Sequence, residues 1–304
     1  MVRFTRILYP TDLSAAAAPA LAYAASLARW YKASLTVLHV VPTLDAIQVP
    51  PEALGESTHV AYPPSQDAIV ADMRRTLTLD RFDGLDLDVC VETGDPDRVI
   101  VDQALARGAS LVVMGTHGRR GFDRLFHGAV AERVLRRAPC PVLMIPPHVT
   151  PAPEDPIFTR ILCPIDFSPA SHQAFGFALD LASQSNGAVT AFHVLEWMAD
   201  DDPAPYGPFN VAAYRGHLEA DAEARLTTLA DSEPHPWCEV TPVVATGRSH
   251  REILAQAEAL DANLIVMGSQ GRGGMGGVFF GSTTQHVVRA AECPVLVVRV
   301  VSPT

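Results

Sequence analysis

Short apolar runs alternate with longer amphipathic segments along this 304-residue chain. In the first half the pattern predicts strands at 6–9, 35–41, 85–92, 111–114 and 141–145. It predicts helices at 15–31, 67–79, 96–107 and 129–137, with Ser14 as the N-cap of the first. Because the strands are apolar throughout, they favour a parallel sheet covered by helices on both faces. We therefore predict an α/β fold with doubly wound parallel sheets, which bind ligands beyond the carboxyl ends of their strands.

The same segments occur twice. RILYPTDLS at 6–14 returns as RILCPIDFS at 160–168, and LVVMGTHGRRG at 111–121 returns as LIVMGSQGRGG at 264–274. The offset is 154 residues for the first pair and 153 for the second. A period of this length indicates duplicated domains rather than a solenoid of short repeats. The segment at 146–156 holds five prolines, so we predict domains at 1–146 and 157–304 joined by a linker at 147–156.

Composition and charge exclude several classes of protein. The net charge is −11 and Lys32 is the only lysine, so there is no Walker A loop, and a broad nucleic-acid-binding face is disfavoured. The five cysteines form no C-x-x-C pair, which indicates neither a disulfide framework nor a zinc site. The most apolar long window, at 15–28, is too short to cross a membrane, and no secretion signal is recognisable. We expect a cytoplasmic protein with no membrane partner.

Glycine-rich segments follow the fourth predicted strand of each half. In both, two residues separate the first two glycines and nine separate the second from the third. The positions are Gly115, Gly118 and Gly128 in the first half, and Gly268, Gly271 and Gly281 in the second. Glycine lets the backbone approach a ligand closely, and the N–H groups at the start of the next helix suit phosphate. A single loop of this kind could also be an ordinary turn.

These segments together resemble the universal stress proteins in their tandem two-domain form. ATP-binding members of that family carry the pattern G-x(2)-G-x(9)-G-[ST], which the second half matches through Gly281-Ser282, followed by Thr283. The resemblance implies a Rossmann-like domain in each half. It further implies that Asp166 lies beside the ribose and phosphates and that the backbone of Val194 binds adenine, with Asp12 and Val40 as counterparts in the first half. A carboxylate at these positions could instead cap the following helix.

The first half departs from the family pattern at one position. Ala129 stands where the pattern has a hydroxyl residue, so the second half is predicted to be the better ATP site. A hydrogen bond to a charged group contributes about 1.5–3 kcal/mol, which is the size of the expected loss. If a polyphosphate lies beside Asp12 or Asp166, a magnesium ion between the two negative charges is a reasonable hypothesis.

The resemblance implies a stress-response or signalling protein that acts through nucleotide-dependent conformation or binding of an unidentified protein partner. Two alternatives stay open: an enzyme that slowly hydrolyses ATP, and a scaffold that binds no nucleotide. Efficient catalysis is disfavoured because, apart from Asp166, no general base is evident, and we assign no catalytic or metal-ligating residue. The halves are expected to pack through their last strands as a pseudo-twofold dimer, and whole chains are expected to form homodimers.

Overall fold

The computed structural model describes residues 1–42, 65–77, 82–116, 129–149, 158–196, 211–232, 238–271 and 280–299. Its first half contains strands β1 (Arg6–Thr11), β2 (Ser34–Pro42), β3 (Leu87–Gly94), β4 (Leu111–Gly115) and β5 (Val142–Ile145). Its helices are α1 (Ala18–Tyr31), α2 (Gln66–Leu77), α3 (Pro96–Ala106) and α4 (Ala129–Arg137). A short 3-10 helix, η1, covers Ala15–Ala17.

The second half repeats this order of elements. Its strands are β6 (Arg160–Pro164), β7 (Ala188–Leu195), β8 (Glu239–Thr246), β9 (Leu264–Gly268) and β10 (Val295–Val298). Its helices are α5 (Pro169–Gln184), α6 (Val211–Ser232), α7 (Ser249–Ala259) and α8 (Ser282–Ala290). The predicted linker at 147–156 stays a prediction, because 150–157 lie outside the described ranges.

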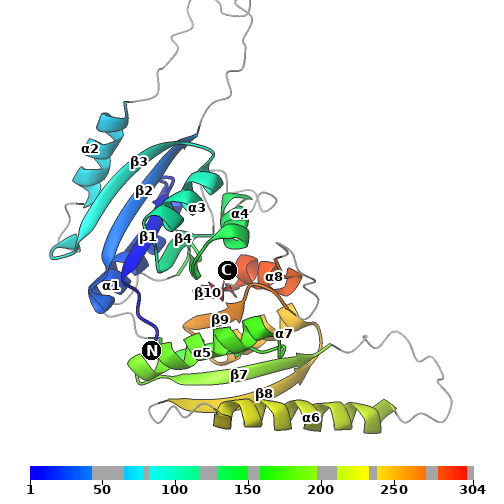
Figure 1. Cartoon of the computed structure of the whole chain (residues 1–304). Coiled ribbons are helices and arrows are strands. Elements are labelled where there is room, and N and C mark those ends of the chain that lie inside the picture. Colours follow the sequence, from blue (N-terminus) through cyan, green and yellow to red (C-terminus); the bar gives the residue numbers. More distant parts are fainter. Residues whose placement is uncertain are drawn as a thin grey trace, which may run out of the picture.

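All ten strands form one sheet, in the order β3-β2-β1-β4-β5-β10-β9-β6-β7-β8 (Figure 1). Within each half the paired strands are parallel, which confirms the predicted doubly wound α/β fold. The halves meet where β5 pairs with β10 in the antiparallel sense, with Leu143 opposite Leu296. The prediction that the last strands of the two halves pair is therefore confirmed.

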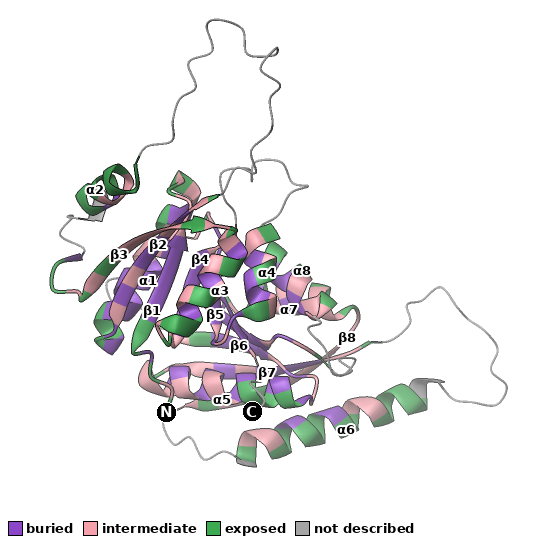
Figure 2. Cartoon of the chain, turned by 45° about the horizontal axis from the view of Figure 1, so that its top comes forward, coloured by how far each residue is buried: buried purple, intermediate pink, exposed green. Residues whose placement is uncertain are grey.

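Helices cover both faces of the sheet, and each face has a continuous hydrophobic core that crosses from one half to the other. One core lies beneath α1, α2, α5 and α6 and includes Tyr9, Leu143, Phe175 and Leu296. The other lies beneath α3, α4, α7 and α8 and includes Leu8 and Phe192. Alternate residues of a strand point to opposite faces, so Leu8 and Tyr9 enter different cores. Buried residues accordingly follow the strands (Figure 2).

The first helix begins later than the sequence predicts. Residues 15–17 form η1, α1 starts at Ala18, and the side chain of Ser14 makes no capping hydrogen bond. Pro19 explains the difference, because it has no N–H to bond to the carbonyl four residues earlier. In the second half the proline is Pro169, at the first helical position, where a missing N–H costs nothing, and the Ser168 hydroxyl accepts a hydrogen bond from the Ser171 N–H.

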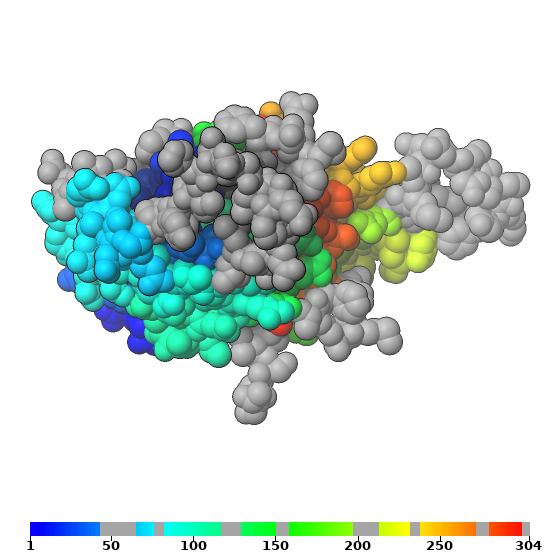
Figure 3. All heavy atoms as spheres, turned by 90° about the horizontal axis from the view of Figure 1, so that it is seen from above, coloured from blue at the N-terminus to red at the C-terminus, as the bar shows by residue number. Residues whose placement is uncertain are grey.

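An ion-pair cluster joins the two halves on the face of α4 and α8. Glu132 of α4 lies 2.7 Å from Arg136 of the same helix and 3.5 Å from Arg289 of α8. Hydrogen bonding from Arg136 is the largest cause that lowers the pKa of the Glu132 carboxyl. Residues of α8 and its neighbours (orange to red) lie beside α4 (green) when the molecule is seen from above (Figure 3).

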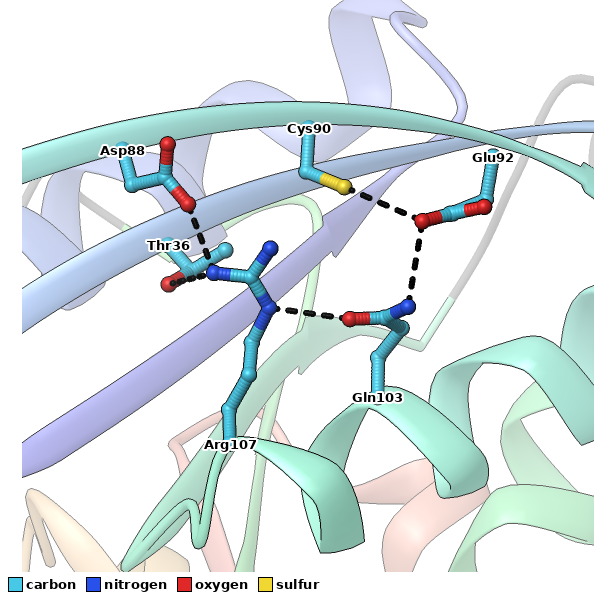
Figure 4. A network of polar contacts seen from close by, with 6 residues as sticks. All are labelled: Thr36, Asp88, Cys90, Glu92, Gln103 and Arg107. Atoms are coloured by element: carbon cyan, nitrogen blue, oxygen red, sulfur yellow. Dashed lines mark hydrogen bonds and ion pairs between the residues drawn. The ribbon is translucent and has the colours of Figure 1, made fainter.

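A second polar network is found only in the first half, between α3 and β3 (Figure 4). Arg107 lies 2.6 Å from Asp88 and donates to Gln103, which in turn donates to Glu92. The corresponding residues of the second half include Val243, Ala245 and Leu260, which pack against the hydrophobic core. Cys90, Glu92 and Arg107 of the first half thus correspond to apolar residues in the second.

Candidate functional site

The turn after β6 places Asp166 at the carboxyl edge of the second half. One Asp166 oxygen, Oδ1, accepts a hydrogen bond from the Ser168 N–H at 3.0 Å. The N-cap of α5 is Ser168, so capping the helix is not the role of Asp166. Phe167, between the two, has a left-handed backbone with φ of 62°. Such a conformation is costly for a bulky residue and is often found at functional sites.

The first half builds the same turn. Asp12 Oδ1 accepts from the Ser14 N–H at 3.0 Å, and Leu13 has φ of 62°, as Phe167 does. His39 and His193 each place Nδ1 within hydrogen-bonding distance of the carbonyl directly before the aspartate, at 2.8 and 2.6 Å. Both histidines therefore support the turn as packed strand residues, as their apolar setting in the sequence indicates.

Two glycines of the second half allow close approaches that a side chain would prevent. A Cβ added to Gly268 would lie 2.9 Å from the carbonyl carbon of Ala170, in the first turn of α5. A Cβ added to Gly271 would lie 2.7 Å from the second oxygen of Asp166, Oδ2. Gly268 therefore packs strand against helix, whereas Gly271 lies directly against the candidate aspartate.

Gly281 is the third glycine of the second half's glycine-rich segment. Its N–H donates to the carbonyl of Ser269 at 2.9 Å, and its nearest neighbours across space include the backbone of Gly271. Its backbone, with φ −63° and ψ 135°, is one that any residue adopts, and an added Cβ would meet only ordinary contacts of 3.5–3.8 Å. Neither the backbone nor the packing of the described residues requires glycine here.

Helix α8 starts at this point with Ser282, whose side chain is exposed, and Thr283. The next residue, Thr284, is buried, and its hydroxyl donates to the Gly268 carbonyl at 2.9 Å. This bond ties the first turn of α8 to the end of β9. The sequence pattern does not single out Thr284, whose counterpart in the first half is Ala131.

Val194 lies near the end of β7, on the neighbouring strand. Ile165 N donates to Phe192 O at 2.7 Å, so the backbone groups of Phe192 face β6. Alternation along the strand places the backbone groups of Val194 on the same side. The ladder between β6 and β7 ends at Pro164 and Phe192, and Val194 lies beyond it, on the side of the Asp166 turn.

The structure brings the predicted residues of the first half together only in part. Val40 on β2 is buried and pairs in register with Glu92, and Gly115 ends β4 beside Ile145. Gly118 and Gly128 lie outside the described ranges. Ala129 is the first residue of α4, as Ser282 is of α8.

Sequence reasoning missed a group of polar side chains where α7 meets α8. Ser249, the first residue of α7, donates to Glu196 at 2.6 Å. His250 stacks on His286 of α8, with ring centroids 4.6 Å apart. The packing of α7 against α8 brings the two histidines together, whereas Ser249 meets Glu196 directly after β7. No spacing within one segment indicates either contact.

The cysteines and acidic residues show no sign of metal or redox chemistry in the described ranges. No group of three or more His, Cys, Asp or Glu side chains there could hold a metal ion. Burial raises the pKa of the Cys140 and Cys293 thiols to about 12, so both are poor nucleophiles.

No helix among the described residues is long and apolar enough to span a bilayer.

Comparison with known proteins identifies the family. The model of the universal stress protein family matches residues 3–146 and, separately, residues 158–299. The chain belongs to the universal stress protein family. Since both matches lie in one chain, it is a tandem member of that family.

Universal stress proteins of other organisms resemble it along most of its length. One from Mycobacterium tuberculosis is 31% identical over 269 residues, covering 87% of each chain. One from Mycolicibacterium smegmatis is 29% identical over 305 residues, covering 96% of each. The crystal structure of a universal stress protein from Archaeoglobus fulgidus shares the fold, with a TM-score of 0.63 and 23% identity over 97% of this chain and 98% of that one.

Proposed function

We propose that this universal stress protein binds ATP in its second half and that nucleotide occupancy alters its conformation or its binding of a protein partner in the stress response. The observation that carries the proposal is the cluster of Asp166, Gly271 and Gly281 at one carboxyl edge. Gly271 lies against Oδ2 of the Asp166 carboxylate, and Gly281 is a glycine that the described residues around it do not require. Space kept open at a helix start suits a phosphate group.

Each part of the nucleotide has a suitable neighbour in this arrangement. The N–H groups at the start of α8 and the hydroxyl of Ser282 would bind phosphate oxygens. The backbone of Val194, beyond the ladder with β6, would hydrogen-bond adenine. Asp166, whose Oδ1 accepts from the Ser168 N–H, would accept from the ribose hydroxyls.

Magnesium fits the site only as a companion of the phosphates. Asp166 supplies one carboxylate, and magnesium commonly binds one or two carboxylates together with phosphate oxygens and water. The ion would offset the repulsion between the carboxylate and the polyphosphate. Asp166 would then hold the ion and orient the nucleotide.

We propose a weaker ATP site in the first half, because Ala129 cannot donate the hydrogen bond that Ser282 would make. The proposal includes a cytoplasmic homodimer, following the family resemblance. The direct test is the nucleotide content of freshly purified protein after denaturation, followed by a turnover assay. Bound ATP without turnover supports the proposal, whereas rapid turnover supports an ATP-hydrolysing enzyme. If the purified protein contains no nucleotide and binds none, the result supports a scaffold.

Replacing Ser282 by alanine is expected to weaken ATP binding about ten- to a hundredfold, the equivalent of about 1.5–3 kcal/mol. The variant loses one hydrogen bond to a charged phosphate. The fold should persist, because the exposed Ser282 side chain contributes little to the core. Calorimetric titration of ATP with and without magnesium measures the effect. Thr228→Ala on α6, which also removes a hydroxyl, is the matched control. Equal affinities of wild type and Ser282→Ala would place the phosphates elsewhere.

Replacing Ala129 by serine is expected to strengthen ATP binding by the first half, because it restores a hydroxyl at the start of α4. A second binding event, or a tighter one, should appear in the same titration, with a gain of up to about 1.5–3 kcal/mol. Combining Ala129→Ser with Ser282→Ala isolates the first half. If the combined variant binds no better than Ser282→Ala alone, the hydroxyl is not what the first half lacks.

A further inference from the structure

The contact between the last two helices of each half uses different chemistry in the two halves. In the first half, Asp97 of α3 is buried and lies 2.9 Å from Arg133 of α4. In the second half, the corresponding positions hold His250 of α7 and His286 of α8. An ion pair of opposite charges thus corresponds to a pair of groups that carry the same charge when protonated.

The histidine pair is connected to the proposed phosphate site. The two rings stack with centroids 4.6 Å apart and planes 25° apart. His286 Nδ1 lies 2.7 Å from the carbonyl oxygen of Ser282, the first residue of α8. His250 is the second residue of α7. The pair therefore links the first turns of the two helices, one of which would bind phosphate.

The surroundings of His250 disfavour its charged form. Partial burial lowers its pKa most, followed by the positive fields of His286, Arg251 and Arg248, while Glu196 opposes them. With its folded-state pKa below the ordinary value near 6.5, neutral His250 stabilises the fold above that pH. This contribution is lost as the pH falls from 6.5 toward the lowered value. In the first half, burial raises the pKa of the Asp97 carboxyl most, while the positive charge of Arg133 lowers it.

We propose that His250 is a positioning residue that, while neutral, holds the first turn of α8 through its stack on His286, so that mild acidification loosens this turn and weakens phosphate binding by the second half. The corresponding turn of α4 carries an ion pair, Asp97 with Arg133, in place of the two imidazole rings. The effect on phosphate rests on the proposed function, whereas the effect on the helix does not. The two halves of one chain would therefore differ in their response to pH.

Hydrogen exchange of the full-length protein without nucleotide tests the helix. Wild type is compared with the double variant His250→Asp/His286→Arg, which copies the pair of the first half, at about pH 8 and about pH 5.5. At the lower pH the Gln285 amide, which donates to the Gly281 carbonyl across the first turn of α8, and the α8 amides after it should exchange at least about threefold faster in wild type than in the variant, and the amides of α4 equally fast in both. Comparing proteins at the same pH cancels the intrinsic effect of pH on exchange.

The variant His250→Gln covers the case in which the double variant does not fold. It keeps His286 but removes the group at position 250 that gains a charge on acidification, so it should also abolish the faster exchange at low pH. If α8 of wild type exchanges no faster at about pH 5.5 than α8 of the folded variants, the proposal is overturned.

Titration of ATP at both pH values tests the consequence for binding. The affinity of wild type should fall at least about threefold more than that of the variants. Protonation of ATP itself affects all proteins alike and cancels. If none of the proteins binds ATP at either pH while α8 still responds, the proposed function fails and the positioning role of the histidines stands. Equal losses of affinity in all proteins would overturn the link to phosphate binding.

Discussion

Replacing Leu296 by alanine is expected to lower the free energy of unfolding by about 2–5 kcal/mol. Leu296 is 2% exposed and lies opposite Leu143 in the antiparallel pair that joins the halves. The truncation leaves a cavity where core residues of both halves meet, and the surrounding strands can close it only in part. Urea denaturation followed by circular dichroism measures the change.

Leu105→Ala on α3 is the control for this experiment, because its side chain is 68% exposed. It removes the same atoms and should change stability by less than about 0.5 kcal/mol. A loss below about 1 kcal/mol for Leu296→Ala would contradict a tightly packed junction between the halves.

Replacing Gly281 by alanine is expected to weaken ATP binding by more than about tenfold while changing stability by less than about 1 kcal/mol. The added Cβ would make only ordinary contacts with the described residues, and the backbone conformation of Gly281 suits alanine. The loss would arise because the methyl group fills space that a phosphate needs. Gly271→Ala should weaken binding at least as much for another reason, since its Cβ would displace the Asp166 carboxylate.

Thermal unfolding and ATP titration of both variants distinguish these effects. Gly216→Ala on α6 is the control, because no atom lies within 4 Å of the added Cβ. It should leave binding unchanged and stabilise the helix slightly. Normal ATP affinity in Gly281→Ala would show that no phosphate lies at the start of α8.

Most of the fold could be predicted because local patterns of apolar and polar residues determine its strands and helices. Apolar strands between amphipathic helices indicate a parallel sheet, and Pro96 and Gly94 mark the start of α3 closely. The start of α1 was missed because Pro19 lies inside an otherwise favourable alanine-rich run. Its missing N–H outweighed the helix propensity of alanine.

The candidate site was predictable where it depends on spacing. The glycine positions and Asp166 follow from the repeat and from the family pattern, and the structure brings Asp166, Gly271 and Gly281 together. The contact of His250 with His286 could not be predicted, because 35 residues separate them and only helix packing unites them. The role of Ser168 as N-cap, rather than Asp166, likewise required the backbone geometry of the turn.

The antiparallel junction also determines how many strand edges the molecule presents. Two separate five-stranded sheets would have four edges, whereas the joined sheet has two, at β3 and β8. Pro242 removes one backbone donor from β8, which makes that edge a poorer template for a strand of another chain. A single half on its own would present β5 or β10 as an apolar edge and would need a second half to cover it. Duplication within one chain supplies that cover at every protein concentration, so the shielding of these edges does not depend on finding another molecule.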